Sequence, residues 1–129
     1  MKVFVYFNLH KKCWSVKALE GENKGRVVAH TTYIVIKDAK FKVSEAGRQR
    51  VLREKKKNVH AGVVGECVGV KYSGMDLLAS GIELPADDLI KVSYNPYKAG
   101  HFVNKETDEP VHTAQFAYLN DKTVMVKHV

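Results

Sequence analysis

Apolar residues recur at every second position through most of this chain, and the spacing changes once, between residues 44 and 57. Alternation with a period of two is typical of β-strands, whereas a spacing of three and four residues is typical of a helix. Strands are expected over 2–10, 13–18, 26–30, 32–37, 59–72, 89–94, 113–119 and 123–128. The pattern predicts an α+β fold: a mostly antiparallel twisted sheet or half-open barrel with one main basic helix. The 129 residues are expected to form a single domain, 1–129.

Three stretches interrupt the predicted strands. Asp38-Ala39 is expected to break the pattern after the fourth strand. The sequence MDLLA, at 75–79, predicts a short helical turn, followed by a loop at Pro85. The connection 96–110 is long, and connections of this length are more often functional or mobile than short ones.

Cationic residues concentrate in the predicted helix and just after it. Residues 44–60 carry six Lys and Arg against two Glu, a net +4 of the formal +7 of the whole protein. At helical spacing Arg50, Arg53 and Lys57 share one face. A cationic face of this kind predicts contact with a polyanion.

The ends of this helix have local signals. Ser44 is a suitable N-cap residue, and the helix is expected to end near Lys57, where lysines suit the negative end of the helix dipole. Gly47 lies within the first turn and weakens a helix by about 1 kcal/mol relative to Ala.

The composition favours nucleic acid as the partner. The isoelectric point is near 9.4, and nucleic acid is the commonest polyanion of the cytosol. Residues 1–12 have too short an apolar core for a secretory signal, and no apolar run approaches the ~20 residues that span a bilayer. A cytoplasmic location is therefore expected, in the host cell if a phage encodes the protein, with no membrane partner. The alternative is a basic surface without a function.

Aromatic residues lie among cations in the long connection. Tyr94 lies just before it, and Tyr97 and Phe102 lie within it, with Lys98 and His101 interleaved. Aromatic rings stack on unpaired bases while neighbouring cations hold the backbone, the combination that binds single-stranded nucleic acid. The alternative is that Tyr94 and Phe102 are core residues that anchor the loop.

Histidines are numerous, with six in the chain. No HExxH, HxH or CxxC motif is present, so no metal and no cofactor is expected. Metal-independent cleavage of RNA needs a base, an acid and cations beside the phosphate. Because imidazole titrates near neutral pH, His10, His30 and His60 are candidate catalytic residues, with Arg50 and Arg53 among the phosphate clamps. The alternative is that each histidine is a hydrogen-bonded structural residue or a solvated one.

Four stretches together resemble an uncharacterised group of small basic proteins predicted in tailed-phage genomes. They are YFNLHKKCWSV (Tyr6–Val16), GRVVAH (Gly25–His30), AGRQRVLREKKKNVHAGVVGE (Ala46–Glu66) and SYNPYKAGHFV (Ser93–Val103). This resemblance implies a phage origin and no particular activity. Separately, HAGVVGE (His60–Glu66) is similar to the first histidine segment of EndoU-type ribonucleases, which favours the ribonuclease hypothesis.

The leading hypothesis is a small phage-type protein that binds nucleic acid, RNA in preference to DNA. The expected contact residues are Arg48, Arg50, Arg53, Lys55, Lys57, Tyr94, Tyr97 and His101. Metal-independent endoribonuclease activity is an extension of this hypothesis. The alternative is a non-enzymatic inhibitor of a host defence protein or of a host protein that processes nucleic acid.

Overall fold

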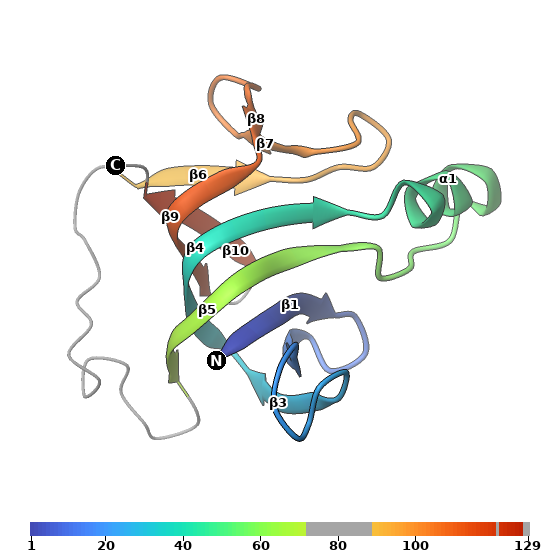
Figure 1. The fold of residues 1–129 in the computed structure, drawn as a ribbon. Helices are drawn as coiled ribbons and strands as arrows, with labels where there is room; N and C mark the ends of the chain where they lie inside the picture. The colour runs from blue at the N-terminus through green and yellow to red at the C-terminus, as the bar shows by residue number, and fades with distance from the viewer. Residues whose placement is uncertain (72–88, 121, 128–129) are drawn as a thin grey trace.

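The computed structural model describes residues 1–71, 89–120 and 122–127 (Figure 1). In chain order their elements are β1 (Lys2–Asn8), β2 (Cys13–Ala18), β3 (Val27–Thr31), β4 (Tyr33–Val43), α1 (Glu45–Glu54), β5 (Ala61–Lys71), β6 (Ile90–Ser93), β7 (Phe102–Asn104), β8 (Pro110–Val111), β9 (Thr113–Asn120) and β10 (Thr123–Lys127). The helical turn predicted at 75–79 and the loop predicted at Pro85 lie outside these residues.

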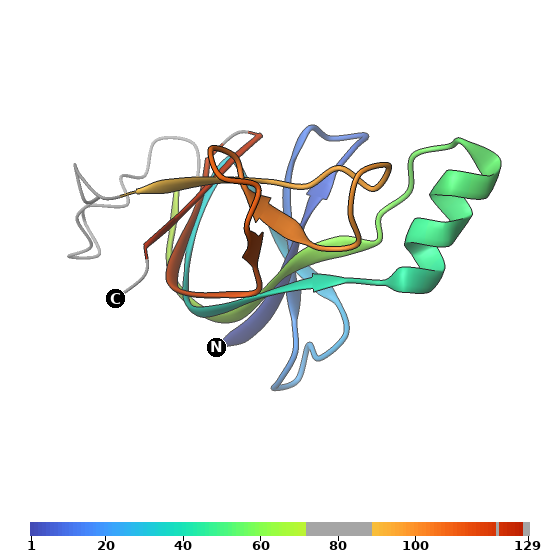
Figure 2. The same ribbon diagram turned by 90° about the horizontal axis from the view of Figure 1, so that it is seen from above.

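The strands form one open sheet in the order β3-β2-β1-β5-β4-β9-β10-β6-β7-β8. Neighbouring strands are antiparallel throughout, including β9 and β10, which form a hairpin at the end of the chain. Figures 1 and 2 show the sheet curling strongly, and core residues of β1 and β2 pack with core residues of β6 and β10. The two edges, β3 and β8, are not joined to each other.

The prediction of an α+β class with a main helix is wrong, because the fold is largely β. In the described part of the chain α1 is the only helix, and it has ten residues. It connects β4 to β5, which are neighbours in the sheet, and it projects from one end of them (Figure 2). The helix is therefore a connection between paired strands and not a second layer. No helix among the described residues is long and apolar enough to cross a membrane.

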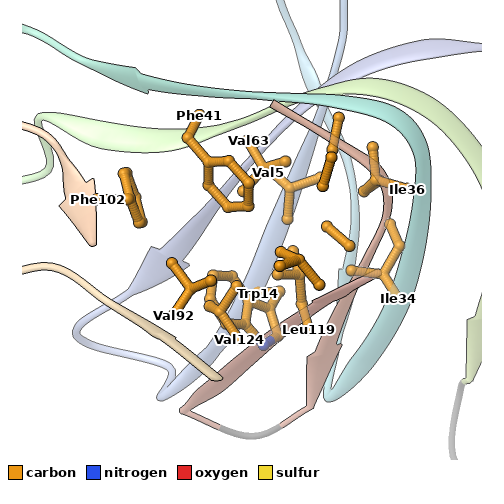
Figure 3. Packing of buried hydrophobic residues seen from close by; sticks show 14 of the residues in the cluster. Val5, Trp14, Ile34, Ile36, Phe41, Val63, Val92, Phe102, Leu119 and Val124 are labelled. Atoms are coloured by element: carbon orange, nitrogen blue, oxygen red, sulfur yellow. The ribbon is translucent and has the colours of Figure 1, made fainter. Parts of the chain in front are cut away.

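The core fills the inside of the curled sheet. Figure 3 shows Phe41, Val92, Phe102 and Val124 there, together with Trp14 of β2. In the central strand β4 apolar residues occupy both faces: Ile34 and Ile36 point to this core, whereas Tyr33 and Val35 belong to a smaller cluster that includes Tyr118. Residues apolar on both faces are typical of a strand buried within a sheet.

Strand β4 continues through Asp38-Ala39, where the sequence predicted a break. The inward-facing positions change from 34 and 36 to 39 and 41, so the strand carries one extra residue between them. Its pairing with β5 shifts at this point, and Asp38 has a left-handed backbone with φ of 51°. An extra residue of this kind is a β-bulge, which bends a strand and increases its twist without ending it.

Candidate functional site

Helix α1 is fixed to the connection that follows β6. The Ser44 hydroxyl caps the helix and accepts a hydrogen bond from the Gly47 N–H at 3.3 Å. The Arg48 guanidinium group donates from Nε to the Pro96 carbonyl at 2.9 Å and from Nη1 to the Glu45 carboxylate at 3.0 Å. Arg48 was predicted to contact phosphate, and in this arrangement it joins the helix to the connection.

The helix ends earlier than the sequence predicted. Lys55 adopts a left-handed backbone conformation, with φ of 55°, and its N–H donates to the Val51 carbonyl at 2.8 Å. This conformation ends the helix, and the following five residues have no regular secondary structure. Lys57 therefore does not share a helical face with Arg50 and Arg53.

His60 has hydrogen-bond partners at both ring nitrogens. Nδ1 lies 2.8 Å from Asn58 Oδ1 and 3.2 Å from Asn58 O, and both of these atoms are acceptors. We therefore assign the proton of the neutral ring to Nδ1, so that Nε2 accepts a hydrogen bond from the Tyr94 hydroxyl at 2.6 Å. Burial raises the pKa of Tyr94, which keeps this hydroxyl protonated. In this arrangement neither nitrogen of His60 is open to a substrate.

Tyr94 and Phe102 anchor the connection between β6 and β7 to the core. Their ring centroids lie 5.1 Å apart, and Phe102 packs in turn on Phe41 at 4.9 Å. Tyr97 is different, because 59% of it is exposed. Of the two predicted aromatic contact residues, Tyr97 thus presents its ring to solvent, and Tyr94 is held by His60 and Phe102.

A groove of about 510 Å³ is lined by residues of β1, β2, β5, β6, β7 and β10 and of their connections, and we name it the lysine groove. Its lining includes the aromatic residues Phe7, Trp14, Tyr94 and Phe102, of which Trp14 and Phe102 are largely buried, and the exposed lysines Lys57, Lys91, Lys105 and Lys122. No Asp or Glu is found among its lining residues in the described part of the chain. None of the four lysines forms an ion pair with a described residue. The groove therefore combines four lysines with aromatic side chains in one lining.

A second cavity, of about 550 Å³, lies between α1 and the connection after β6, and we name it the helix pocket. Val51, Asn58, His60 and Asn95 contribute to its lining, together with three exposed apolar residues: Leu9, Val59 and Tyr97. The helix pocket shares Phe7, Leu9, Lys57, Ala61 and Tyr94 with the lysine groove. The two cavities are thus adjoining parts of one site.

The other predicted cations lie on the helix outside this site. Arg50 pairs with Glu54 at 2.8 Å, whereas Arg53 and Lys55 are exposed and form no ion pair within the described ranges. Sequence reasoning missed Lys91, Lys105 and Lys122. They come from separate segments of the chain, and no spacing in the sequence indicates that they meet.

The remaining histidines have other surroundings. His10 lies in the turn after β1, and the Asn8 side chain accepts hydrogen bonds from that turn. His30 Nδ1 lies 3.0 Å from the hydroxyl of the buried residue Ser15. The rings of His101 and His112 are 5.8 Å apart. The three predicted catalytic histidines, 10, 30 and 60, thus have different partners, and the structure records no contact between their rings.

Over the described ranges, no three His, Cys, Asp or Glu residues are grouped as a metal site.

Comparison with known proteins places the chain among phage proteins. A family described as "Mycobacterium phage L5 gene 82 protein" matches residues 1–127. The gene 82 protein of Mycobacterium phage L5 is 40% identical over 131 residues, an alignment that covers 96% of this chain and 94% of that protein. No solved structure matches, and the similarity of His60–Glu66 to EndoU-type ribonucleases is not supported by these matches. The predicted resemblance to phage proteins is confirmed, and the chain belongs to the family of the Mycobacterium phage L5 gene 82 protein.

Proposed function

We propose that this phage protein binds single-stranded RNA in the lysine groove without cleaving it, in the cytoplasm of the host. The observation that carries the proposal is that four lysines line the same groove as aromatic side chains, with no carboxylate among the described lining residues. Lysines without acidic partners attract phosphate groups, and exposed base faces favour aromatic and apolar surfaces.

Two features of the groove favour a single strand of RNA. The bases of a duplex are stacked on one another and cannot contact the aromatic side chains of the groove, whereas unpaired bases can. Ser93 and Thr123 also line the groove, and their hydroxyl groups are suitable partners for the ribose 2′-hydroxyl that distinguishes RNA from DNA.

The hydrogen bonds of the histidines favour binding over catalysis. A general base needs a ring nitrogen within reach of the proton that it removes. His60 uses both nitrogens within the protein, and His30 uses one with Ser15. We therefore expect labelled RNA to remain intact during incubation with the protein in EDTA, and metal-independent cleavage that His60→Ala abolishes would overturn this part of the proposal.

The dependence of binding on salt tests the proposed groove. For single strands the logarithm of the binding constant falls with the logarithm of salt concentration with a slope of about −0.7 per phosphate contact. Four lysines predict a slope of about −3, measured by fluorescence anisotropy with a labelled RNA oligonucleotide. Replacing Lys57, Lys91, Lys105 and Lys122 together by Gln is expected to weaken binding strongly and to flatten the slope.

The matched control is Lys42→Gln, which removes the same type of charge from an exposed site next to Phe41 on β4. Phe41 points into the core, and successive side chains of a strand point to opposite faces, so Lys42 lies on the outer face of the sheet. The control is expected to retain the wild-type slope. Unchanged binding by the fourfold variant, or a flat response of the wild type, would contradict the proposal.

A specific observation supports the alternative function, inhibition of a host protein. Leu9, Val59 and Tyr97 expose 42%, 50% and 59% of their surface around the helix pocket. Grouped apolar exposure is typical of protein-binding sites as well as of ligand sites. Binding to a host protein that is insensitive to salt, without binding to RNA, is the outcome that would favour this alternative.

A further inference from the structure

The helix pocket adjoins the lysine groove, and its lining differs from that of the groove. We infer that the helix pocket holds one unpaired nucleobase of the strand whose phosphates lie in the lysine groove, and so gives the protein a base preference. The inference rests on the proposed function, because it assigns a second role within the same site. Its volume, about 550 Å³, falls in the range of about 300–1,000 Å³ that is usual for pockets that bind small molecules.

Lys57 is the residue that couples the two cavities. It lines both of them, so a phosphate held by its ammonium group lies at their junction. The base attached to that nucleotide can then enter the helix pocket while the neighbouring nucleotides remain in the groove. Leu9 and Tyr94 also line both cavities, which leaves a continuous surface between them.

The lining of the helix pocket suits a planar ring with polar edges. Tyr97 exposes its ring beside Pro96 and Val59, and an exposed aromatic ring is a stacking surface for a base. Asn95 Oδ1 accepts a hydrogen bond from the Tyr97 N–H at 3.0 Å, which fixes the orientation of this amide. Its Nδ2 donors have no partner among the described residues and can reach an acceptor on a base edge.

The charge of the helix pocket favours a nucleotide over an apolar segment of a protein partner as its occupant. Lys57 lines the pocket and supplies a positive charge, and no carboxylate is found among the described lining residues. A nucleotide brings a phosphate together with its base and so complements the charge of Lys57, whereas an apolar side chain does not. The occupant that the observations favour is therefore a nucleotide, and a protein segment is an outcome of the test.

Homopolymeric RNA oligonucleotides of equal length test the inference. We expect the wild type to bind one of oligo(A), oligo(U) and oligo(C) about tenfold more tightly than the weakest of them at constant salt. Tyr97→Ala is expected to lower the affinity for the preferred oligonucleotide by about tenfold and to remove the preference, with the salt slope unchanged. Tyr97→Phe keeps the ring and is the matched control. Because Tyr97 is exposed, its variants are expected to melt like the wild type.

Lys91→Gln is the contrasting variant, and it is expected to weaken binding to all the oligonucleotides equally and to reduce the salt slope. As a second readout, 2-aminopurine within the oligonucleotide should be quenched by the wild type and by Tyr97→Phe, and not by Tyr97→Ala. Salt-dependent binding without base preference, unaffected by Tyr97→Ala, would overturn the inference and leave the proposed function intact. Absence of salt-dependent binding would overturn both, and loss of a host-protein contact in Tyr97→Ala would then assign the pocket to a protein segment.

Discussion

Tyr33 buries a hydroxyl group that has no hydrogen-bond partner in the described part of the chain. A buried, unpaired polar group costs about 1–3 kcal/mol of stability. We therefore expect Tyr33→Phe, which removes only this oxygen, to raise the free energy of unfolding at pH 7 by about 1 kcal/mol. Urea denaturation measures the change. Tyr97→Phe, at an exposed position, is the control and should leave stability unchanged.

The same residue predicts a loss of stability in alkali. Burial raises the pKa of Tyr33 from 10.0 to about 12. Between these values the unfolded state releases the phenolic proton while the folded state retains it, so the free energy of unfolding falls as pH rises. Tyr33→Phe should lack this part of the pH dependence. Parallel stability curves for the two proteins up to pH 12 would contradict the assignment.

Glu45 gives a matching prediction in acid. Hydrogen bonds from Gln49 and Arg48, and the charge of Arg48, hold the pKa of the Glu45 carboxyl below its ordinary value of 4.5. The contribution of this carboxylate to the free energy of unfolding is therefore complete above about pH 4.5, and it is lost as pH falls through the lower pKa of the folded state. Glu45→Gln should flatten the acid limb of the stability curve. Glu106→Gln, at an exposed loop residue, should retain the wild-type acid limb.

At the scale of single elements, Gly47 shows why helix propensity is a poor guide in α1. On propensity alone, Gly47→Ala would stabilise the helix by about 1 kcal/mol. A Cβ atom at residue 47 would, however, collide with the Cβ atom of His60. We expect Gly47→Ala to lower the free energy of unfolding by about 1–3 kcal/mol, the usual cost of overpacking.

A double-mutant cycle separates these two effects. His60→Gly removes the atom with which the new methyl group collides, so Gly47→Ala should no longer destabilise the protein in that background. Thermal melts of the four proteins give the interaction energy. Equal destabilisation with and without the His60 side chain would place the cause in the helix itself.

The elements of this fold could be predicted from the sequence where the signal is local. The Ser44 cap, the closing hairpin and most strands follow from residue type and alternation. The end of α1 was misplaced because Lys55 adopts a backbone conformation that lysine rarely adopts. The break predicted at Asp38-Ala39 is a bulge, and its signal was the change of inward-facing positions from 36 to 39. The fold class was wrong because a helix that joins two paired strands adds no layer.

The candidate site was harder to predict, because it exists only at the scale of the whole molecule. The charge density of the segment 44–60 predicted contact with nucleic acid. In the structure, however, Arg48 holds the connection after β6 through the Pro96 carbonyl, and Arg50 pairs with Glu54. No sequence pattern marks Lys91, Lys105 and Lys122 as site residues, since each is a single lysine in its own segment. They meet Lys57 because the sheet order brings β6, β7 and β10 opposite β1 and β2.

A β-bulge bends a strand, and Asp38 places one in a central strand of the sheet. It lies in the middle of β4, whose pairing with β9 continues without a shift, whereas its pairing with β5 shifts between residues 35 and 36 and shifts back between residues 37 and 40. The curvature of the sheet is thus a property of the hydrogen-bonded backbone of its central strands, and it does not depend on a hinge. We expect the lysine groove to be preorganised, so that the proposed RNA strand binds without a rearrangement of the protein. Association should then be rapid, and most of the conformational entropy lost on binding should be that of the RNA.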